Sequence, residues 1–313
     1  MYGDLKIFTG RSHRQLSERI CESLRLDLGK VELNNFADGE IFCQIEDNVR
    51  GCDVFVIQPG SFPVNENLME LLILIDACRR ASAFRITAVL PYYPYARQDK
   101  KDMPRVAISS KLVANLITVA GADRILTMDL HAAQIQGFFD LPVDHLFAAP
   151  VVLEAIRKMD IPDLTIVSPD AGGVERARAI AKRLHAELAI ADKRRVAANE
   201  ADVLHIIGNV EGRNVLILDD IIDTAGTLSK NVAALKTKGA QRILAAGVHA
   251  VLSDPAIERI MESPLEAVLV TDTTPLDDKL RRCAKLQPLT VAPLLAEAIR
   301  RIHENSSVSS LFV

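Results

Sequence analysis

Short runs of aliphatic residues alternate with amphipathic stretches along the whole chain. Eight of these runs predict strands: Lys6–Thr9, Val54–Gln58, Ile86–Leu90, Ile125–Met128, Thr165–Ser168, Val215–Leu218, Arg242–His249 and Ala267–Thr271. The runs are almost continuously apolar, as in parallel sheets that helices cover on both faces. Between them, stretches such as Glu66–Arg80, Gly173–Leu184 and Leu228–Lys238 place apolar residues at helical spacing. This alternation predicts an α/β fold built from βαβ units.

The same succession of elements occurs in both halves of the chain. In each half an apolar run leads through a polar segment into an amphipathic helix and then into another apolar run. We interpret this as one α/β unit used twice, with residues 1–147 and 148–292 as the two domains. Chance similarity between two βαβ units is the alternative. The last amphipathic stretch, residues 293–303, predicts a helix that packs on the first domain.

Composition and charge narrow the class of protein. The chain has 313 residues, 49% of them hydrophobic and 25% charged, with a net charge of −4. These values are typical of globular proteins, and the length exceeds what one core usually holds. No apolar run reaches the ~20 residues of a membrane span, and a basic face for nucleic acid is not indicated. Five cysteines without a Cys-x-x-Cys pair predict reduced thiols and a cytoplasmic location.

The segment after Val215–Leu218 carries the strongest chemical pattern. Two adjacent carboxylates, Asp219 and Asp220, follow the apolar run directly. The residues before the next helix are small, hydroxylated or acidic: Asp223, Thr224, Ala225, Gly226 and Thr227. Small residues let backbone N–H groups approach an anion, and a helix N-terminus adds positive dipole. Carboxylates at a strand end can accept hydrogen bonds from sugar hydroxyls, so the pattern fits a ribose 5-phosphate site. An ordinary helix with Asp223 as its N-cap is the alternative.

This segment resembles the pentose-phosphate motif of type I phosphoribosyltransferases. Five more stretches, in the same order as in the family, resemble ribose-phosphate pyrophosphokinases: Phe36–Glu40, Tyr95–Asp99, Asp129–Phe139, Val167–Gly173 and Asp192–Arg195. The resemblance implies two similar domains of the type I phosphoribosyltransferase fold, each a mostly parallel sheet flanked by helices. It implies Mg²⁺-dependent transfer of the pyrophosphoryl group of ATP to the C1 hydroxyl of ribose 5-phosphate. The products would be phosphoribosyl pyrophosphate, for nucleotide biosynthesis, and AMP.

The resemblance also assigns roles to single residues. The catalytic cations would be Lys193 and Arg195, at the start of a lid formed by Val196–Ala201. The ATP-binding residues would be Phe36, Asp38, Gly39, Glu40, Arg97 and Gln98. The ribose 5-phosphate site would comprise Arg195, Asp219, Asp220, Asp223, Thr224, Ala225, Gly226 and Thr227. The Mg²⁺ ligands would be His131 and Asp170. Without the resemblance, the Lys-Arg-Arg triplet would be interpreted as solvated surface charge.

Two alternatives use the same fold. An ordinary phosphoribosyltransferase would explain residues 219–227, but not the Asp38-Gly39-Glu40 and Arg97-Gln98 elements. A non-catalytic regulatory paralogue would be expected to lack functional residues that are present here. In the related enzymes a neighbouring subunit completes the adenine pocket, so the resemblance implies a homo-oligomer, with a hexamer as the expected form.

Overall fold

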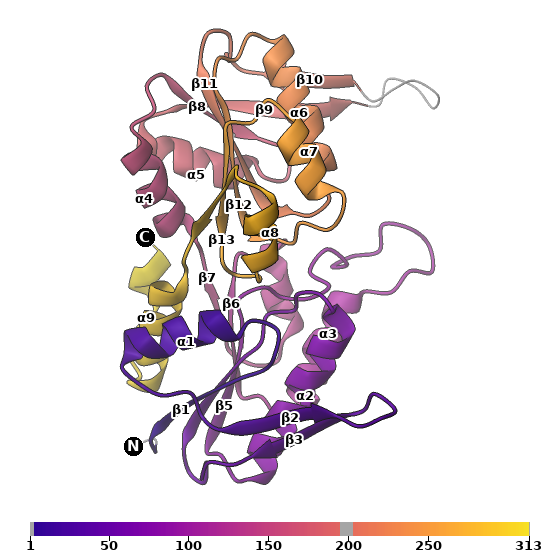
Figure 1. Cartoon of the computed structure of the whole chain (residues 1–313), viewed down its shortest axis with the longest axis vertical. Helices are drawn as coiled ribbons and strands as arrows, with labels where there is room; N and C mark the ends of the chain where they lie inside the picture. Colours follow the sequence, from indigo (N-terminus) through magenta and orange to yellow (C-terminus); the bar gives the residue numbers. More distant parts are fainter. Residues whose placement is uncertain (1–2, 195–202, 313) are drawn as a thin grey trace. The chain divides into compact units, whose positions relative to one another are not determined.

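The computed structural model describes residues 3–194 and 203–312 and divides the chain into two compact units. The first unit comprises the residues up to Phe147, the short piece Thr273–Pro275 and the segment from Val291 onward. The second comprises Ala148–Asp272 and Leu276–Thr290. The chain therefore leaves the first unit, builds the second and returns. Each unit has its own sheet (Figure 1).

The first unit is built around a five-stranded parallel sheet of order β1-β4-β5-β6-β7. Its strands are β1 (Leu5–Thr9), β4 (Asp53–Ile57), β5 (Arg85–Leu90), β6 (Arg124–Met128) and β7 (Val143–Leu146). Its helices are α1 (Arg14–Leu24), α2 (Val64–Arg80), α3 (Ser109–Ala120), α9 (Ala292–His303) and the 3₁₀ segments η1 (Ala133–Phe138) and η2 (Ser309–Phe312). An antiparallel hairpin is formed by β2 (Val31–Asn35) and β3 (Ile41–Ile45).

Helices cover both faces of this sheet. Apolar residues of α2 and α3 form one core cluster with alternate residues of the strands. Helix α1 lies against α9, and Figure 1 shows both on the opposite face from α2 and α3. Each fully buried aliphatic side chain contributes about 1.5–3 kcal/mol to folding. The C-terminal helix is therefore a structural part of the first unit.

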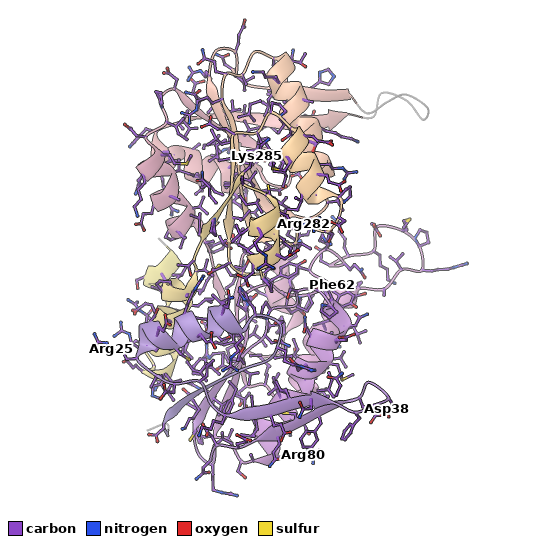
Figure 2. The ribbon with its side chains drawn as sticks, viewed as in Figure 1. Arg25, Asp38, Phe62, Arg80, Arg282 and Lys285 are labelled. Carbon is purple, nitrogen blue, oxygen red and sulfur yellow. The ribbon has the colours of Figure 1, made fainter. Side chains whose placement is uncertain are left out.

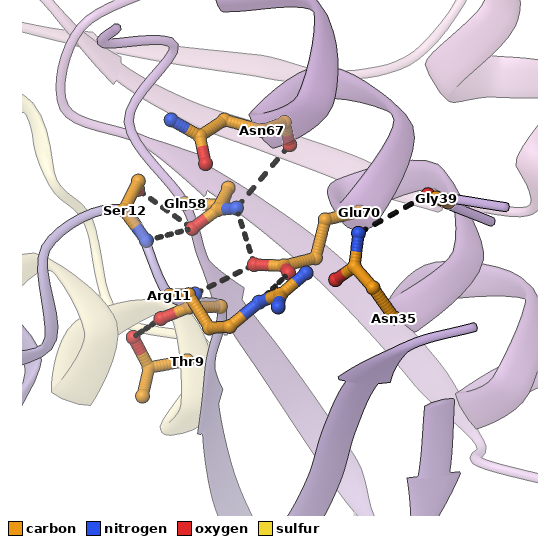
Figure 3. A network of polar contacts seen from close by, with 9 residues as sticks. Thr9, Arg11, Ser12, Asn35, Gly39, Gln58, Asn67 and Glu70 are labelled. Atoms are coloured by element: carbon orange, nitrogen blue, oxygen red, sulfur yellow. Dashed lines mark hydrogen bonds and ion pairs between the residues drawn. The ribbon is translucent and has the colours of Figure 1, made fainter. Parts of the chain in front are cut away.

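A buried polar network orders the carboxyl ends of β1 and β4 (Figure 3). The Glu70 side chain, only 1% exposed, accepts hydrogen bonds from the Arg11 backbone N–H at 2.6 Å and from Gln58 Nε2 at 2.9 Å. The Arg11 guanidinium also donates to Glu70, and Ser12 Oγ donates to Gln58 Oε1 at 2.6 Å. Burial of Glu70 is tolerable because its charge is paired and hydrogen-bonded.

The second unit contains a seven-stranded sheet of order β10-β9-β8-β11-β12-β13-β14. Its strands are β8 (Leu164–Ser168), β9 (Glu187–Arg194), β10 (Val203–Ile207), β11 (Asn214–Ile222), β12 (Ile243–Ala250), β13 (Ala267–Thr271) and β14 (Leu286–Leu289). Its helices are α4 (Ala149–Met159), α5 (Val174–Leu184), α6 (Gly226–Thr237), α7 (Ala256–Glu262) and α8 (Asp277–Arg282). Among the described strands of this sheet, β10 alone runs antiparallel to its neighbour.

Two core clusters cover the two faces of this sheet. On β11, Val215 and Ile217 pack with α6, α7 and α8, while Leu216 and Leu218 pack with α4 and α5. Successive residues of a strand point to opposite faces, which explains why the strand is apolar without interruption. Figure 1 shows the same division, with α4 and α5 on one side of the sheet and α6 and α7 on the other.

The predicted α/β class, with mostly parallel sheets flanked by helices, is confirmed. All eight predicted strands are present with bounds shifted by at most one residue, except that β11 continues to Ile222. Asp219 and Asp220 therefore belong to the strand and do not follow it. All five cysteines are free thiols. Within the described residues, no helix combines the length and apolarity that a membrane span requires.

Candidate functional site

Strand register brings three predicted site segments to one edge of the second unit's sheet. Strand β8 lies between β9 and β11, with Ser168 opposite Ile190 and Val167 opposite Ile217. The strands are parallel, so β9 from Asp192 and β11 from Asp219 extend past the carboxyl end of β8, where Asp170 follows. Open α/β sheets bind their ligands at this edge. Lys193 lies inside β9, with its backbone opposite Leu204.

The carboxylates of Asp219 and Asp220 form a coupled pair. Burial and a hydrogen bond with Asp220 raise the pKa of Asp219 to about 8. The nearby charge of Asp170 acts in the same direction. Asp220 also has a cationic neighbour, since its Oδ1 lies 3.6 Å from Arg176 Nη1 on α5. A carboxyl that holds its proton can donate a hydrogen bond to a sugar hydroxyl, and the other carboxyl oxygens of the pair can accept one.

Asp170 sits in a tight turn that opens α5. Its Oδ1 accepts a hydrogen bond from the Gly173 N–H at 2.9 Å, and the Ser168 hydroxyl donates to its carbonyl at 2.7 Å. A Cβ at Gly173 would lie 2.9 Å from Ser168 Oγ, so a side chain here would have to displace this hydroxyl. The residue is exposed, and its carboxylate suits a hard cation such as Mg²⁺.

The loop between β11 and α6 has the form of an anion cradle. Its N-cap residue is Ala225, in the left-handed region at φ 55°, whose methyl side chain cannot cap the helix. The alternative of Asp223 as N-cap is therefore wrong. Gly226 begins the helix, and Arg259 Nη1 donates to the Thr224 carbonyl at 2.9 Å. Uncapped N–H groups at a helix start attract an anion.

The predicted ATP-binding residues of the first unit fall on two separate loops. Phe36, Asp38, Gly39 and Glu40 form the exposed turn of the β2–β3 hairpin, whose tip carries Asp38 (Figure 2). The Phe36 N–H donates to the Glu40 carbonyl at 2.8 Å, and Gly39 adopts φ 95°, a value that favours glycine. The Phe36 ring is 55% exposed and packs edge-on against Phe42. It is therefore available for stacking.

Arg97 and Gln98 follow β5. Both side chains are exposed, and the Gln98 N–H donates to the Tyr95 carbonyl at 2.9 Å, while its own carbonyl accepts from the Ser110 N–H at 3.2 Å. Tyr95 has a positive φ of 58°. This turn anchors the start of α3 and holds Arg97 at the carboxyl edge of the sheet.

His131 lies in the loop after β6 of the first unit, at the same kind of edge. Asp129 takes the left-handed conformation at φ 38°, which aspartate tolerates better than most residues. The next N–H, that of Leu130, donates to His145 Nε2 at 2.9 Å. The loop therefore turns sharply and leaves the His131 side chain exposed.

Three parts of the predicted site are not defined by the structure. Arg195 and the expected lid Val196–Ala201 lie outside the described residues, as does the side chain of Lys193. Within residues 3–194 and 203–312, no cluster of three or more His, Cys, Asp or Glu side chains could hold a metal ion. A metal ion at Asp170 would thus need ligands beyond the side chains of the described residues, such as substrate phosphates.

Three cations near the carboxyl edge of the second unit were not identified from sequence. Arg176 pairs with Asp220, Arg259 contacts Thr224, and Lys279 on α8 lies near Asp223. Each belongs to an ordinary amphipathic helix pattern, in which a cation usually faces solvent. No sequence signal separates them from their neighbours.

Comparisons with known proteins cover almost the whole chain. Family models match residues 5–121, as the N-terminal domain of ribose phosphate pyrophosphokinase, and residues 192–313, as a phosphoribosyl synthetase-associated domain. A ribose-phosphate pyrophosphokinase of Synechococcus elongatus is 54% identical over 98% of this chain and 93% of its own length. One of Neisseria meningitidis is 52% identical over 99% and 95%. The crystal structure of phosphoribosylpyrophosphate synthetase from Mycobacterium smegmatis matches with a TM-score of 0.92 at 44% identity, over 97% of this chain and 100% of that one.

Proposed function

The chain belongs to the ribose-phosphate pyrophosphokinase family, and we propose that its phosphate loop and hairpin carry this family's reaction. The family predicted from six motifs is thereby confirmed. The C1 hydroxyl oxygen of ribose 5-phosphate attacks the β-phosphorus of ATP, and the bond from that phosphorus to the α–β bridging oxygen breaks. The hydroxyl loses its proton, AMP leaves, and phosphoribosyl pyrophosphate forms. The ordinary phosphoribosyltransferase and the non-catalytic paralogue explain less, because near full-length relatives are named pyrophosphokinases.

The observation that carries the proposal is the arrangement at the end of β11. A carboxylate pair, Asp219 and Asp220, stands beside the start of α6, whose N-cap residue is a left-handed Ala225. The pair suits the sugar hydroxyls and the loop Asp223–Thr227 suits the 5-phosphate. We assign ribose 5-phosphate to this edge of the second unit, with Arg195 as a further ligand.

ATP is assigned to the first unit's exposed elements. The hairpin turn with Phe36 offers a ring face to adenine, and Asp38, Gly39 and Glu40 offer polar groups to the nucleotide. Arg97 and Gln98 stand at the carboxyl edge of the sheet, where a guanidinium suits a phosphate chain. Lys193 and Arg195 are assigned as the catalytic cations. Cations placed around the transferred group stabilise its developing charge.

Mg²⁺ is assigned to Asp170 and His131. Asp170 is the stronger candidate, because carboxylate oxygens suit this ion and imidazole suits softer metals. A bound Mg²⁺ would supply positive charge to the phosphate oxygens of ATP. This chain's residues contribute by binding and orienting the two substrates. The cytoplasmic location remains a prediction from the sequence.

A homo-oligomer is supported by an apolar stripe on α3. Leu112, Leu116 and Val119 recur on one side of this helix, and Val119 is 77% exposed. Exposed apolar side chains in a contiguous row are typical of subunit interfaces. The expected hexamer rests on the family resemblance alone.

The decisive experiment measures the nucleotide product. The full chain is incubated with ATP, Mg²⁺ and ribose 5-phosphate, and the nucleotides are separated by chromatography. We expect AMP in equal amount to phosphoribosyl pyrophosphate, and no AMP when ribose 5-phosphate is left out. Formation of ADP would indicate transfer of a single phosphoryl group and would overturn the proposal, as would the absence of any turnover.

A further inference from the structure

The anion cradle of the second unit stands among three acidic side chains: Asp219, Asp220 and Asp223. A sugar phosphate carries negative charge, so uncompensated carboxylates here would repel it. Asp219 is offset by the proton that burial and Asp220 favour, and Asp220 is offset by Arg176 at 3.6 Å. Asp223 belongs to the phosphate loop itself, so its compensation bears most directly on ligand binding.

Lys279 supplies a positive charge beside Asp223. Its Nζ donates to the carbonyls of Val251 at 2.5 Å and Ala250 at 3.3 Å, at the carboxyl end of β12. Ala250 is the register partner of Ile222, the residue before Asp223. Burial lowers the pKa of Lys279, and the charge of Asp223 acts against that effect by favouring the ammonium. Lys279 therefore links the end of β12 to the electrostatics of the loop.

Arg259 holds the same loop from α7. Its Nη1 donates to the Thr224 carbonyl at 2.9 Å and would lie 3.3 Å from a Cβ placed on Gly226. The contact fixes a carbonyl of the loop just before Ala225, whose left-handed conformation is costly for a residue with a side chain. A guanidinium at this point also adds positive charge next to the first-turn N–H groups of α6, which have no intrahelical partner.

Both cations come from helices that pack with α6. Apolar residues of α6, α7 and α8 belong to one core cluster on a single face of the sheet. Arg259 and Lys279 therefore lie on helices that pack against the same core as α6, the helix that follows the loop. Because a protein core is close-packed, a displacement of α7 or α8 would be transmitted to α6.

We propose that Lys279 and Arg259 are positioning residues for ribose 5-phosphate, which hold the loop Asp223–Thr227 in its anion-binding form and offset the charge of Asp223. This inference rests on the proposed function and deepens it, because it names residues outside the phosphate loop that set affinity for the sugar phosphate. Lys279 acts mainly through charge, and Arg259 acts mainly through the Thr224 carbonyl. Neither is assigned a contact with the reacting atoms.

The test measures equilibrium binding and does not depend on turnover. Ribose 5-phosphate is titrated into the full chain by calorimetry in the presence of Mg²⁺ and α,β-methylene ATP. In this analogue a methylene group replaces the oxygen between the α- and β-phosphorus atoms, so the reaction cannot break that link. We expect Lys279→Met to weaken ribose 5-phosphate binding at least tenfold, about 1.4 kcal/mol. Binding of the ATP analogue should change less than twofold. Lys279→Arg, which keeps the charge, should restore affinity to within about threefold of the wild-type protein.

Lys285→Met is the matched control. Lys285 likewise donates its ammonium protons to backbone carbonyls, in its case those of Ile260, Met261 and Ser263 at the end of α7 (Figure 2 labels its position). If Lys279→Met weakens ribose 5-phosphate binding only because hydrogen bonds from a lysine to backbone carbonyls are lost, Lys285→Met should weaken this binding equally. That result would overturn the assigned role, as would wild-type affinity in Lys279→Met.

Arg259→Gln tests the proposal without touching a buried side chain, because Arg259 is exposed and its removal leaves the core intact. We expect at least a fivefold loss of ribose 5-phosphate affinity with unchanged thermal stability, and unchanged affinity would contradict the role of Arg259. The wild-type titration separates this inference from the proposed function. If the wild-type chain does not bind ribose 5-phosphate, both fail. If it binds and the variants bind equally well, only this inference fails.

Discussion

Asp219 is a residue whose surroundings favour its protonated form. The side chain is largely enclosed, its neighbour Asp220 is paired with Arg176, and Asp170 lies near enough to act on its charge. Two carboxylates this close cannot both ionise cheaply. A carboxyl that keeps its proton near neutral pH can donate a hydrogen bond, which an ionised carboxylate cannot do. The pair thus offers a sugar both a donor and an acceptor.

The raised pKa of Asp219 has a consequence for stability. The folded pKa of about 8 lies above the usual value near 3.8, so the folded chain holds this proton more tightly than the unfolded chain. Its contribution to stability is therefore present at low pH and is lost as pH rises from about 4 to 8. Asp219→Asn removes this dependence of stability on pH, because asparagine does not titrate.

We expect the Tm of Asp219→Asn to rise relative to that of the wild-type protein from pH 5 to pH 8. Above pH 8 the difference between the two Tm values should stay constant. Calorimetric scans of the unliganded proteins measure this difference. Asp38→Asn, on an exposed turn, is the control and should show no such trend. A Tm difference that stays constant with pH would contradict the assignment.

Lys193 is the residue on which the catalytic assignment depends most. We expect Lys193→Ala to lower kcat at least about 10²-fold, because a cation that stabilises the transferred group is lost. Ribose 5-phosphate binding should survive, since the loop Asp223–Thr227 is untouched. Steady-state kinetics and calorimetry together measure the two effects. Lys182→Ala, an exposed lysine of α5, is the control. A near-normal kcat in Lys193→Ala would disprove the catalytic role.

At this scale the sequence identifies residues of unusual type in unusual places. Adjacent aspartates after an apolar run and a string of small residues before a helix are visible without coordinates. The supporting cations are not, since Arg259 and Lys279 reach the loop from segments 30 or more residues farther along the chain. Whether a helical arginine or lysine faces solvent or a loop depends on packing, which no local pattern encodes.

Helix α9 is fastened to the first unit by a buried ion cluster. The Arg85 guanidinium donates to both carboxylate oxygens of Asp53, and His303 Nδ1 lies 2.8 Å from Asp53 Oδ2. Arg85 also donates to the Ile302 carbonyl at 3.0 Å. Asp53 begins β4, Arg85 begins β5 and His303 ends α9, so the cluster ties two strand starts to the last turn of the helix.

Breaking this cluster should cost far more than breaking an ion pair on the surface. Asp53→Asn leaves the Arg85 charge in a site that is nearly closed to solvent, and we expect a loss of about 3–5 kcal/mol in the free energy of unfolding. Asp76→Asn removes an exposed pair with Arg80 on α2, for which a far smaller loss is expected because water screens both charges. Urea unfolding curves compare the two variants. Equal losses would show that the buried cluster adds nothing.

Elements were predictable from sequence where their own residues determine them. The buried parallel strands are predicted by their apolar runs. Helices α2, α5, α6 and α9 are predicted by apolar residues at helical spacing. The hairpin β2–β3 was missed as secondary structure because β2 is mostly polar and neither strand is buried. The end of β11 was misjudged because pairing with β12 continues the strand through Asp219 to Ile222, and pairing is not visible locally.

At the scale of the whole molecule, self-association can be tested through the stripe on α3. Leu112→Glu together with Val119→Glu places charges where a partner surface is expected, without disturbing buried residues. We expect the wild-type chain to elute as a multiple of 34.3 kDa by light scattering, and the double variant as a smaller species. Leu26→Glu, at an exposed leucine outside the stripe, is the control. A monomeric wild-type protein would contradict the oligomer.

The whole-molecule architecture was only partly accessible from sequence. Alternating patterns predict the α/β class, whereas the return of Thr273–Pro275 to the first unit has no local signal. That the two units are duplicated domains of one ancestral fold, with limits at 147 and 292, stays a prediction.

The split first unit also constrains how the protein is made. Strands β1 to β7 are synthesised first, but α9, which covers one face of their sheet, is translated only after the second unit, Ala148–Asp272 and Leu276–Thr290. At ~5–20 residues per second, roughly 7–30 s pass in between. During that interval the ribosome-bound chain carries an apolar sheet face without one of its covering helices. Such a surface is what chaperones bind, so the nascent chain's last partner before α9 arrives is expected to be a chaperone.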